Sequence, residues 1–398
     1  MKRTLPYLLF ILFSATIFAT EIVKEDGLPR IFIDTKNKVS IDSREKEIPG
    51  TMTWQENAAE KEREPLAITV RCRGNSSFND MPKHSYRVHG EKKFSPPGMA
   101  PHRDWALVTN YADRSMIRNR ITYTLARELG ADFTPRTLDV ELFINGKYEG
   151  VYLLVETPKV SEKRINIKDS EYLVEVDNKY HPKDVVVFDR EKRPFNIKYP
   201  KHPDEKQIAG VKKRIENFEA YLYNEFPSES TLENLSQQMD LEDYFRFYWI
   251  QEVSKNPDLF LSSTYFTLRD DGKIHMGPVW DFDAAYGIYP KKTIPMEWHA
   301  RKRGWNKRLF MNQAFKAAAR EYWNNHHKVF ESMLDSMEVF ARQLTPAAEN
   351  NYRRWDILQD TTNRFHYKKY GNYGETVLSL KTWYRQRMEW IDKALDKE

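Results

Sequence analysis

Three aspartates around one predicted hairpin are the side chains in this sequence best suited to chemistry. Asp258 follows an Asn-Pro pair, and Asp281 and Asp283 flank the phenylalanine of a Trp-Asp-Phe-Asp run. Between them, residues 265–268 and 274–279 are predicted strands joined by an Asp-Asp-Gly-Lys turn. A base, a strand pair and then a metal-binding aspartate follow one another in this order in kinase-type phosphoryl-transfer enzymes. The order therefore predicts ATP chemistry.

The Asp-Phe-Asp turn is a candidate magnesium site. Asp281 and Asp283 stand two residues apart on a turn, so both carboxylates can reach one hard cation, which prefers oxygen ligands. The apolar neighbours Trp280 and Phe282 place the pair at the rim of a core, where an unpaired carboxylate is costly. The alternative is an ordinary surface turn, because Asp-x-Asp pairs are common and most bind nothing.

A second candidate lies in the first third of the chain. The run Arg73-Gly-Asn-Ser-Ser joins two predicted strands and precedes Lys83. It can be interpreted as a loop that covers phosphates, followed by a lysine that binds them. From the loop alone a polar turn is favoured, because it has one glycine and matches neither the Walker pattern nor G-x-G-x-x-G.

The elements that must position these residues form an α+β pattern, β-rich in front and mostly helical behind. The Asn-Gly pair at residues 145–146 is the strongest hairpin indication. Predicted strands cover 30–34, 66–72, 83–88, 138–144, 148–156 and 172–176, and predicted helices cover 117–129, 208–222, 241–253, 312–343 and 377–396.

Length and composition fit a globular enzyme. The chain has 398 residues, of which 40% are hydrophobic and 30% charged, with a net charge of +5. The basic residues are mixed with acids along the chain, which argues against a nucleic-acid partner. We expect a monomer. The single cysteine, Cys72, cannot form an internal disulfide, and its place in a predicted strand favours a small buried side chain over a nucleophile.

The N-terminus predicts export. Residues 1–19 combine Lys2 and Arg3 with a short apolar run and small residues before a polar segment, as in a cleavable secretory signal. No later stretch approaches the length of a transmembrane helix, so no span is expected after removal of the signal. We expect a secreted, periplasmic or cell-surface protein, with an uncleaved anchor as the alternative.

Several blocks in order resemble the spore coat protein H (CotH) family of atypical secreted protein kinases. These blocks are Arg73–Ser77 with Lys83–Arg87, Asp104–Leu107, Phe143–Gly146 with Gly150–Glu156, and Trp280–Asp283. Each block is unspecific by itself, but together they span most of the chain from about residue 30 onward.

The resemblance implies a divergent two-lobed kinase-like fold that uses ATP and Mg²⁺ to phosphorylate serine or threonine on exported proteins. The implied parts are a β-rich N-lobe at 20–160, a connecting segment at 161–205 and a helical C-lobe at 206–398. Asp258 matches the catalytic aspartate, Asp281 the metal-binding aspartate and Lys83 the nucleotide-phosphate lysine. Arg73 and Glu156 are expected near the nucleotide. Lys83, Asp258 and Asp281 should then converge around one triphosphate.

One position departs from the family pattern. Kinases carry a metal-binding asparagine five residues after the base, but here the run Leu261-Ser262-Ser263-Thr264 occupies this place. Ser263 is the candidate within this run for contact with the cofactor. Serine is a poorer magnesium ligand, so either Asp283 supplies the second ligand or phosphotransfer is weakened or lost.

Two other functions therefore stay open. One is a catalytically inactive kinase-like surface scaffold or polysaccharide-associated binding protein, which fits export and the many aromatic residues. The other is a glycosyltransferase with Asp281-Phe282-Asp283 as its nucleotide-sugar metal motif. A zinc site and a serine esterase are not supported, because neither His-x-x-x-His spacing nor G-x-S-x-G is present.

Overall fold

The chain is divided into two units, each assembled from three separate segments. The structure is a computed structural model that describes residues 27–56, 63–226, 231–289 and 294–398. The first unit contains the described residues up to Thr109, with Leu138–Leu154 and Gln343–Leu358. The second contains Asn110–Thr137, Val155–Arg342 and Gln359–Glu398. The predicted export signal, residues 1–19, lies outside the described residues.

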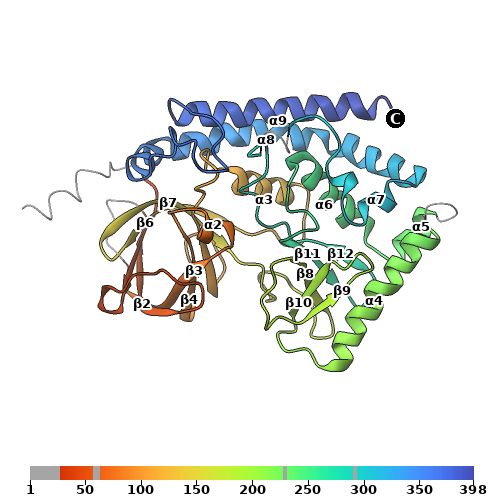
Figure 1. Ribbon diagram of the computed structural model, residues 1–398, viewed down its shortest axis with the longest axis horizontal. Coiled ribbons are helices and arrows are strands. Elements are labelled where there is room, and N and C mark those ends of the chain that lie inside the picture. The colour runs from red at the N-terminus through yellow and green to blue at the C-terminus, as the bar shows by residue number, and fades with distance from the viewer. Residues whose placement is uncertain (1–26, 57–62, 227–230, 290–293) are drawn as a thin grey trace, which may run out of the picture. The chain divides into compact units, whose positions relative to one another are not determined.

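A closed β-barrel forms the first unit (Figure 1). Its strand order is β1-β2-β3-β4-β5-β7-β6, and parallel pairing of β1 with β6 closes it, so that no strand edge stays unpaired. The strands are β1 Arg30–Thr35, β2 Ile48–Gln55, β3 Leu66–Arg73, β4 Ser85–Phe94, β5 His102–Val108, β6 Thr137–Ile144 and β7 Lys147–Glu156. The short helices η1, Lys36–Lys38, and α2, Ser76–Asn79, lie between strands.

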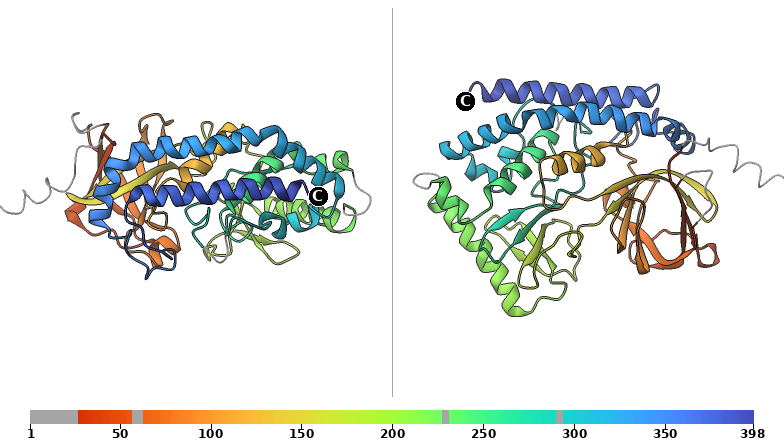
Figure 2. Two further views of the ribbon diagram at one scale, coloured as in Figure 1. Left: turned by 90° about the horizontal axis from the view of Figure 1, so that it is seen from above. Right: turned by 180° about the vertical axis from the view of Figure 1, so that it is seen from behind.

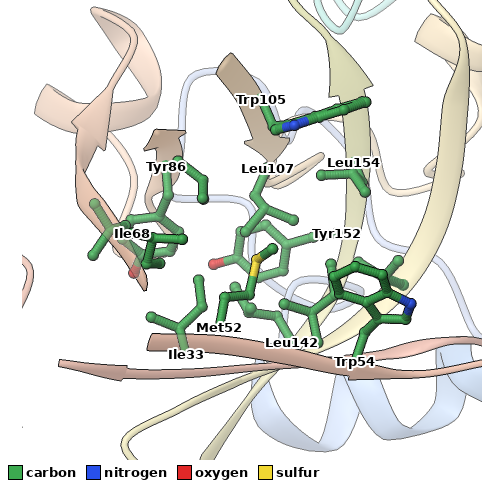
Figure 3. Close-up of a cluster of buried hydrophobic side chains, with 14 of the residues drawn as sticks. Ile33, Met52, Trp54, Ile68, Tyr86, Trp105, Leu107, Leu142, Tyr152 and Leu154 are labelled. Atoms are coloured by element: carbon green, nitrogen blue, oxygen red, sulfur yellow. The ribbon is translucent and has the colours of Figure 1, made fainter. Parts of the chain in front are cut away.

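Alternating apolar residues fill the barrel, as the two-residue period of a strand requires. In β3, for example, Ile68, Val70 and Cys72 are buried. Figure 3 shows how large side chains from several strands, among them Trp105 and Tyr152, meet in this core. Burial raises the pKa of the Cys72 thiol to about 11, so the residue is a packed side chain and no nucleophile at neutral pH.

A five-stranded antiparallel sheet lies in the second unit, in the order β12-β11-β8-β10-β9. Its two faces differ in chemistry. Phe195 and Phe266 on one face contact the ring of Trp305, whereas Glu175 and its register partner Tyr265 share the other face. The strands are β8 Tyr172–Val176, β9 Val186–Phe188, β10 Pro194–Tyr199, β11 Thr264–Leu268 and β12 Ile274–Met276.

Helices make up most of the rest of the second unit. The long helices α8 and α9 lie side by side (Figures 1 and 2), and the Tyr384 hydroxyl of α9 donates to the Phe330 carbonyl of α8 at 2.7 Å. None of the described helices is long and apolar enough to span a bilayer. The helices are α3 Arg118–Glu128, α4 Glu205–Asn224, α5 Leu232–Ser236, α6 Leu241–Ser254, η2 Ala300–Lys302, α7 Asn306–Leu309, α8 Gln313–Arg354 and α9 Tyr373–Leu395. The part of α8 from Gln343 onward belongs to the first unit.

The predicted α+β class is confirmed, and the units divide the chain at other places than the predicted boundaries. Helix α3, expected in a part that ends at residue 160, belongs to the second unit, and residues 343–358 belong to the first. Strands β9 and β10, within the predicted connecting segment 161–205, complete the sheet of the second unit. Sequence patterns report local structure, whereas these groupings depend on contacts between distant segments.

Candidate active site

Asp258 lies in a tight turn between helix α6 and strand β11. Helix α6 ends at Ser254, and the next residue, Lys255, has the left-handed backbone conformation typical of a helix C-cap. The Asp258 carbonyl then accepts hydrogen bonds from the amides of Leu261 and Ser262, at 2.8 and 2.9 Å. The turn therefore fixes the half-buried Asp258 carboxylate just beyond the end of a buried helix.

The Asp281 turn is held by the first turns of α3. The Phe282 amide donates to Asn119 Oδ1 at 2.7 Å, and the Asp281 amide donates to the Tyr123 hydroxyl at 3.3 Å. The Arg118 side chain donates to the backbone carbonyls of Ala285 and Tyr286, just after this turn, at 3.1 and 3.3 Å. Asp281 has φ +66°, which is unusual for a residue other than glycine and occurs often at functional sites.

Four carboxylates from three segments influence one another here. Burial, reinforced by the neighbouring Asp281 carboxylate, raises the pKa of Asp258 to about 6. The pKa of Asp283 is also raised, first by burial and then by Asp281, Asp258 and Asp113. Like charges this close disfavour one another, so a bound cation would stabilise the group. The structure thus brings together the three aspartates that the sequence singled out.

Ser263 extends this cluster. Its hydroxyl donates to Asp281 Oδ2 at 3.5 Å, which is the long limit for a hydrogen bond. The residue therefore lies beside the carboxylate that the kinase pattern assigns to metal, at the place where kinases carry an asparagine.

The aspartates around Asp281 do not form a closed metal cage. Within the described parts of the chain, only Asp240, Asp243 and His275 bring three potential ligand atoms within 4.8 Å of one another. Magnesium does not need such a cage, because it usually keeps several waters and binds one or two carboxylates together with substrate phosphates. Asp281 with Asp283 or Ser263 would fit this mode of binding.

The Asp240 cluster is better described as an ion-paired network. Both ring nitrogens of His275 contact carboxylates, Nδ1 at 2.8 Å from Asp243 and Nε2 at 3.0 Å from Asp271. Burial lowers the pKa of His275, but these two contacts outweigh it and raise the pKa overall. Both ring nitrogens are thus engaged by carboxylates, and neither is turned toward a metal ion.

An accessible ion pair lies on the polar face of the five-stranded sheet. Lys198 Nζ is 3.3 Å from Glu175 Oε2, and the exposed fractions of the two side chains are 34% and 9%. Burial opposes the charge on Lys198, but Glu175 overcomes this effect and raises the pKa of the lysine. Burial dominates at Glu175 and raises its pKa despite the pairing. A register shift between residues 197 and 199 marks a bulge at Lys198, and bulges commonly redirect side chains near active sites.

This ion pair belongs to the surroundings of Asp258. Asp177, two residues after Glu175, accepts a hydrogen bond from the Ser262 hydroxyl at 3.1 Å, and Asn178 N donates to the Leu261 carbonyl at 2.8 Å. Strand β8 therefore leads directly from Glu175 to the Asp258 turn.

Comparison with known protein families gave a match that spans most of the chain. The family model described as CotH kinase protein matches residues 70–391, which is well over half of the chain. The chain belongs to the CotH kinase family. The resemblance inferred from the sequence is thereby confirmed, and membership indicates a kinase-like enzyme. A search of curated proteins gave no match.

Lys83 has a different environment from the one expected of a phosphate-binding lysine in a CotH kinase. It lies in the barrel unit, with 1% of its surface exposed. Its ammonium group donates to the carbonyls of Thr109 and Val151 and to Asn351 Oδ1, at 3.0, 2.6 and 2.9 Å. All three ammonium hydrogens thus have acceptors within the barrel unit, and burial lowers the pKa of Lys83. This geometry favours a structural role.

Arg73 and Glu156 each take part in a hydrogen bond with a residue outside the aspartate cluster. Arg73 ends strand β3 in the barrel unit, and its carbonyl accepts from the Ser77 hydroxyl at 3.2 Å at the start of α2. Glu156 belongs to the second unit, where its buried Oε2 accepts from the Arg136 amide at 3.0 Å. Burial raises the pKa of Glu156, and the contact with Arg136 opposes the rise.

Buried cations hold the segment that follows the Asp281 turn. The carbonyl oxygens of residues 294–297 accept hydrogen bonds at 2.5–2.9 Å, two from Lys255 and two from Arg387. Arg387 also pairs with Glu252 at 2.5 Å, and neither side chain is exposed. Burial, with Arg387 as the next cause, lowers the pKa of Lys255 to about 8. The segment is therefore tied to two helices. Lys255 links it to the end of α6, which precedes the Asp258 turn, and Arg387 links it to α9.

One cavity of the second unit is separate from this chemistry. It has a volume of about 300 Å³ and is lined by parts of α3, α6, β11 and β12, including Asp243, His275 and Arg246. Val279 also lines it, but Asp258, Asp281 and Asp283 do not. The candidate active site therefore rests on the convergence of the aspartates and not on the cavity.

Proposed function

We propose that this chain transfers the γ-phosphoryl group of ATP to serine or threonine hydroxyls of other proteins. The observation that carries the proposal is the meeting of Asp258 with Asp281 and Asp283 in one unit. There the order of helix α6, base, β11–β12 hairpin and metal-binding aspartate matches the catalytic core of kinases. We interpret the fold on this basis as a divergent kinase-like one.

Asp258 has the properties of the base. A pKa of about 6 leaves the carboxylate ionised at neutral pH and still basic enough to accept a proton, which is the compromise that favours general-base catalysis. The acceptor hydroxyl forms its new bond to the γ-phosphorus while the bond from phosphorus to the β–γ bridging oxygen breaks. The hydroxyl proton passes to Asp258, and ADP departs with the bridging oxygen.

Asp281 would hold Mg²⁺, with Asp283 or Ser263 as the further ligand. Bound magnesium supplies charge neutralisation for the phosphate oxygens. The residues fit this role because the crowded carboxylates raise one another's pKa and because α3 fixes the backbone of the turn.

We propose Lys198 in place of Lys83 as the cation that pairs with the nucleotide phosphates. Its ammonium group is partly accessible, and Glu175 holds it in one orientation next to the strand that leads to the Asp258 turn. In protein kinases a Lys–Glu ion pair likewise positions the lysine that contacts the nucleotide phosphates. Sequence reasoning missed Lys198 because β10 lies between two prolines and was assigned to a connecting segment. The signal that could have found it is Glu175, an acidic residue in an otherwise apolar predicted strand.

Ser263 supports a second candidate function, a protein that binds ATP without transfer. A hydroxyl at 3.5 Å from Asp281 is a weaker partner for magnesium than the asparagine amide oxygen found in kinases. The two functions share the binding site and differ only in turnover.

The test is incubation of the protein without residues 1–19 with γ-labelled ATP, Mg²⁺ and a mixture of acceptor proteins. We expect label on acceptors or on the chain itself, lost in Asp258→Asn and Asp281→Asn while circular dichroism stays unchanged. Full transfer by both variants would refute the assignment. Binding of Mg·ATP by wild type with no transfer would select the second function.

We also propose that the protein acts after export, so that its acceptors are secreted or surface proteins. The support is the composition of residues 1–19. Fractionation of cells that express the full chain, with N-terminal sequencing of the mature protein, tests this. An intact N-terminus in the cytoplasm would contradict it.

A further inference from the structure

Two loops beside Asp258 expose large apolar side chains. Leu261, in the Asp258 turn, is 45% exposed. Tyr180, on the loop between β8 and β9, is 38% exposed, and Phe188, the last residue of β9, is 49% exposed. The rings of Tyr180 and Phe188 meet edge to face at 6.4 Å. The hydrogen bond from Asn178 to the Leu261 carbonyl joins the two loops. Grouped exposed apolar side chains commonly mark a surface that binds another molecule.

Basic side chains surround the same place. Arg303 Nη1 donates to the two carbonyl oxygens that flank Asp258, at 2.7 and 3.4 Å. Lys179, next to Tyr180, and Arg364 are exposed, and with Arg303 they act on the Asp258 carboxylate as positive charges.

The acids of the site lie further inside. Asp258, Asp281 and Asp283 are half-buried, and Asp177 is held by Ser262. An approaching chain therefore meets positive charge at the rim before it reaches the carboxylates, which magnesium would neutralise. A positive rim attracts acidic partners and repels basic ones.

We propose that this surface, made of Lys179, Tyr180, Phe188, Leu261, Arg303 and Arg364, docks an acidic, extended segment of the acceptor protein. Acidic side chains pair with the rim, and an apolar side chain next to the serine or threonine packs on Leu261 and the two rings. The inference rests on the proposed function, because it places the acceptor hydroxyl at Asp258. It adds the chemical class of the acceptor.

The experiment uses three labelled peptides that share a central Leu-Ser pair. Glutamates flank the pair in the first peptide, glutamines in the second and lysines in the third. Fluorescence anisotropy measures their binding with Mg²⁺ and a non-hydrolysable ATP analogue, and γ-labelled ATP measures transfer. We expect the acidic peptide to bind at least tenfold more tightly than the basic one at low salt. In 1 M NaCl this ratio should fall to about threefold or less, because screening shortens the range of exposed charges to about 3 Å.

Two variants test the surface itself. Lys179→Glu should lower the acidic-to-basic ratio about threefold or more, in keeping with the modest strength of exposed ion pairs. Lys213→Glu, which makes the same charge change at an exposed lysine of α4, should leave the ratio as in wild type. Leu261→Ser should weaken binding of the Leu-Ser peptide but not that of a Gly-Ser counterpart.

The outcomes separate the two proposals. Equal binding of acidic and basic peptides, or the same change in ratio from Lys179→Glu and Lys213→Glu, would overturn the docking surface. Preferential binding of the acidic peptide without any transfer would support the surface and contradict the proposed catalysis.

Discussion

Replacing Arg387 with methionine should loosen the segment that follows the Asp281 turn. Arg387 makes five hydrogen bonds, three of them to Glu252 and two to the carbonyls of residues 295 and 297. Both charged side chains have no exposed surface. The substitution therefore leaves the Glu252 carboxylate buried without its cation.

The expected cost follows from this burial. Removing one partner of a buried ion pair costs about 3–5 kcal/mol, much more than the loss of an exposed pair. Adding five separate bonds at about 1.5–3 kcal/mol each would exceed this figure, but bonds that share one side chain are not additive. A loss of about 3–5 kcal/mol corresponds to a fall in local protection of about 10²- to 10⁴-fold.

Hydrogen exchange read by mass spectrometry measures this fall directly. Amides of residues 294–301 should exchange faster in Arg387→Met by that factor, and Mg·ATP-dependent transfer should decrease with them. Arg385→Met, at an exposed position of the same helix, is the matched control and should change neither. In the double variant Glu252→Gln/Arg387→Met the loss should be smaller than the sum of the two single losses, because the stranded charge is gone.

The reasoning is refuted if Arg387→Met changes the protection of residues 294–301 by less than about fivefold. It is also refuted if Arg385→Met gives the same result, since the effect would then belong to α9 in general and not to the buried pair.

Three further predictions concern the site. For the pH dependence, kcat/KM should rise about tenfold per pH unit below pH 6 and level off above it, because Asp258 must lose its proton to act as base. Because Asp281 raises the pKa of Asp258, Asp281→Asn should move the titration midpoint of Asp258 below pH 6 in carboxyl NMR. An unchanged midpoint would contradict the interaction between the two carboxylates. Lys198→Met should weaken Mg·ATP binding about 10- to 150-fold, as measured by calorimetry. Lys83→Met should lower the free energy of unfolding of the barrel by about 1–3 kcal/mol in urea and leave the affinity for Mg·ATP unchanged. The reverse pattern would identify Lys83 as the lysine that binds the phosphates. Ser263→Asn should lower the Mg²⁺ concentration needed for half-maximal transfer, and a higher requirement would show that serine is the better ligand here.

Local features of the fold could be predicted well from the sequence. Strand β8 has the predicted bounds, and α6, α9 and the strands β6 and β7 around Asn145-Gly146 lie within a few residues of expectation. Each has a local cause, such as helical periodicity or a turn that needs positive φ. Strands β2, β5 and β10 were not predicted, because their sequences are interrupted by proline, glycine or charged residues and gain their pairing from neighbours.

The candidate site divides in the same way. Asp258, Asp281 and Asp283 could be found from sequence because they lie in two short turns that flank one hairpin, so their proximity is nearly a local property. The role of Lys83 could not be judged in this way. Its three acceptors come from β7, from the end of β5 and from a residue far along the chain, and only the closed barrel brings them together.

By itself, the sequence determined the family, the α+β class and the three aspartates, because motifs and periodicities are written in neighbouring residues. The tertiary structure decided which lysine is enclosed and which is accessible, and it raised the pKa of Asp258 toward neutrality. These properties depend on burial and on charges from distant segments, and no local pattern of residues encodes them.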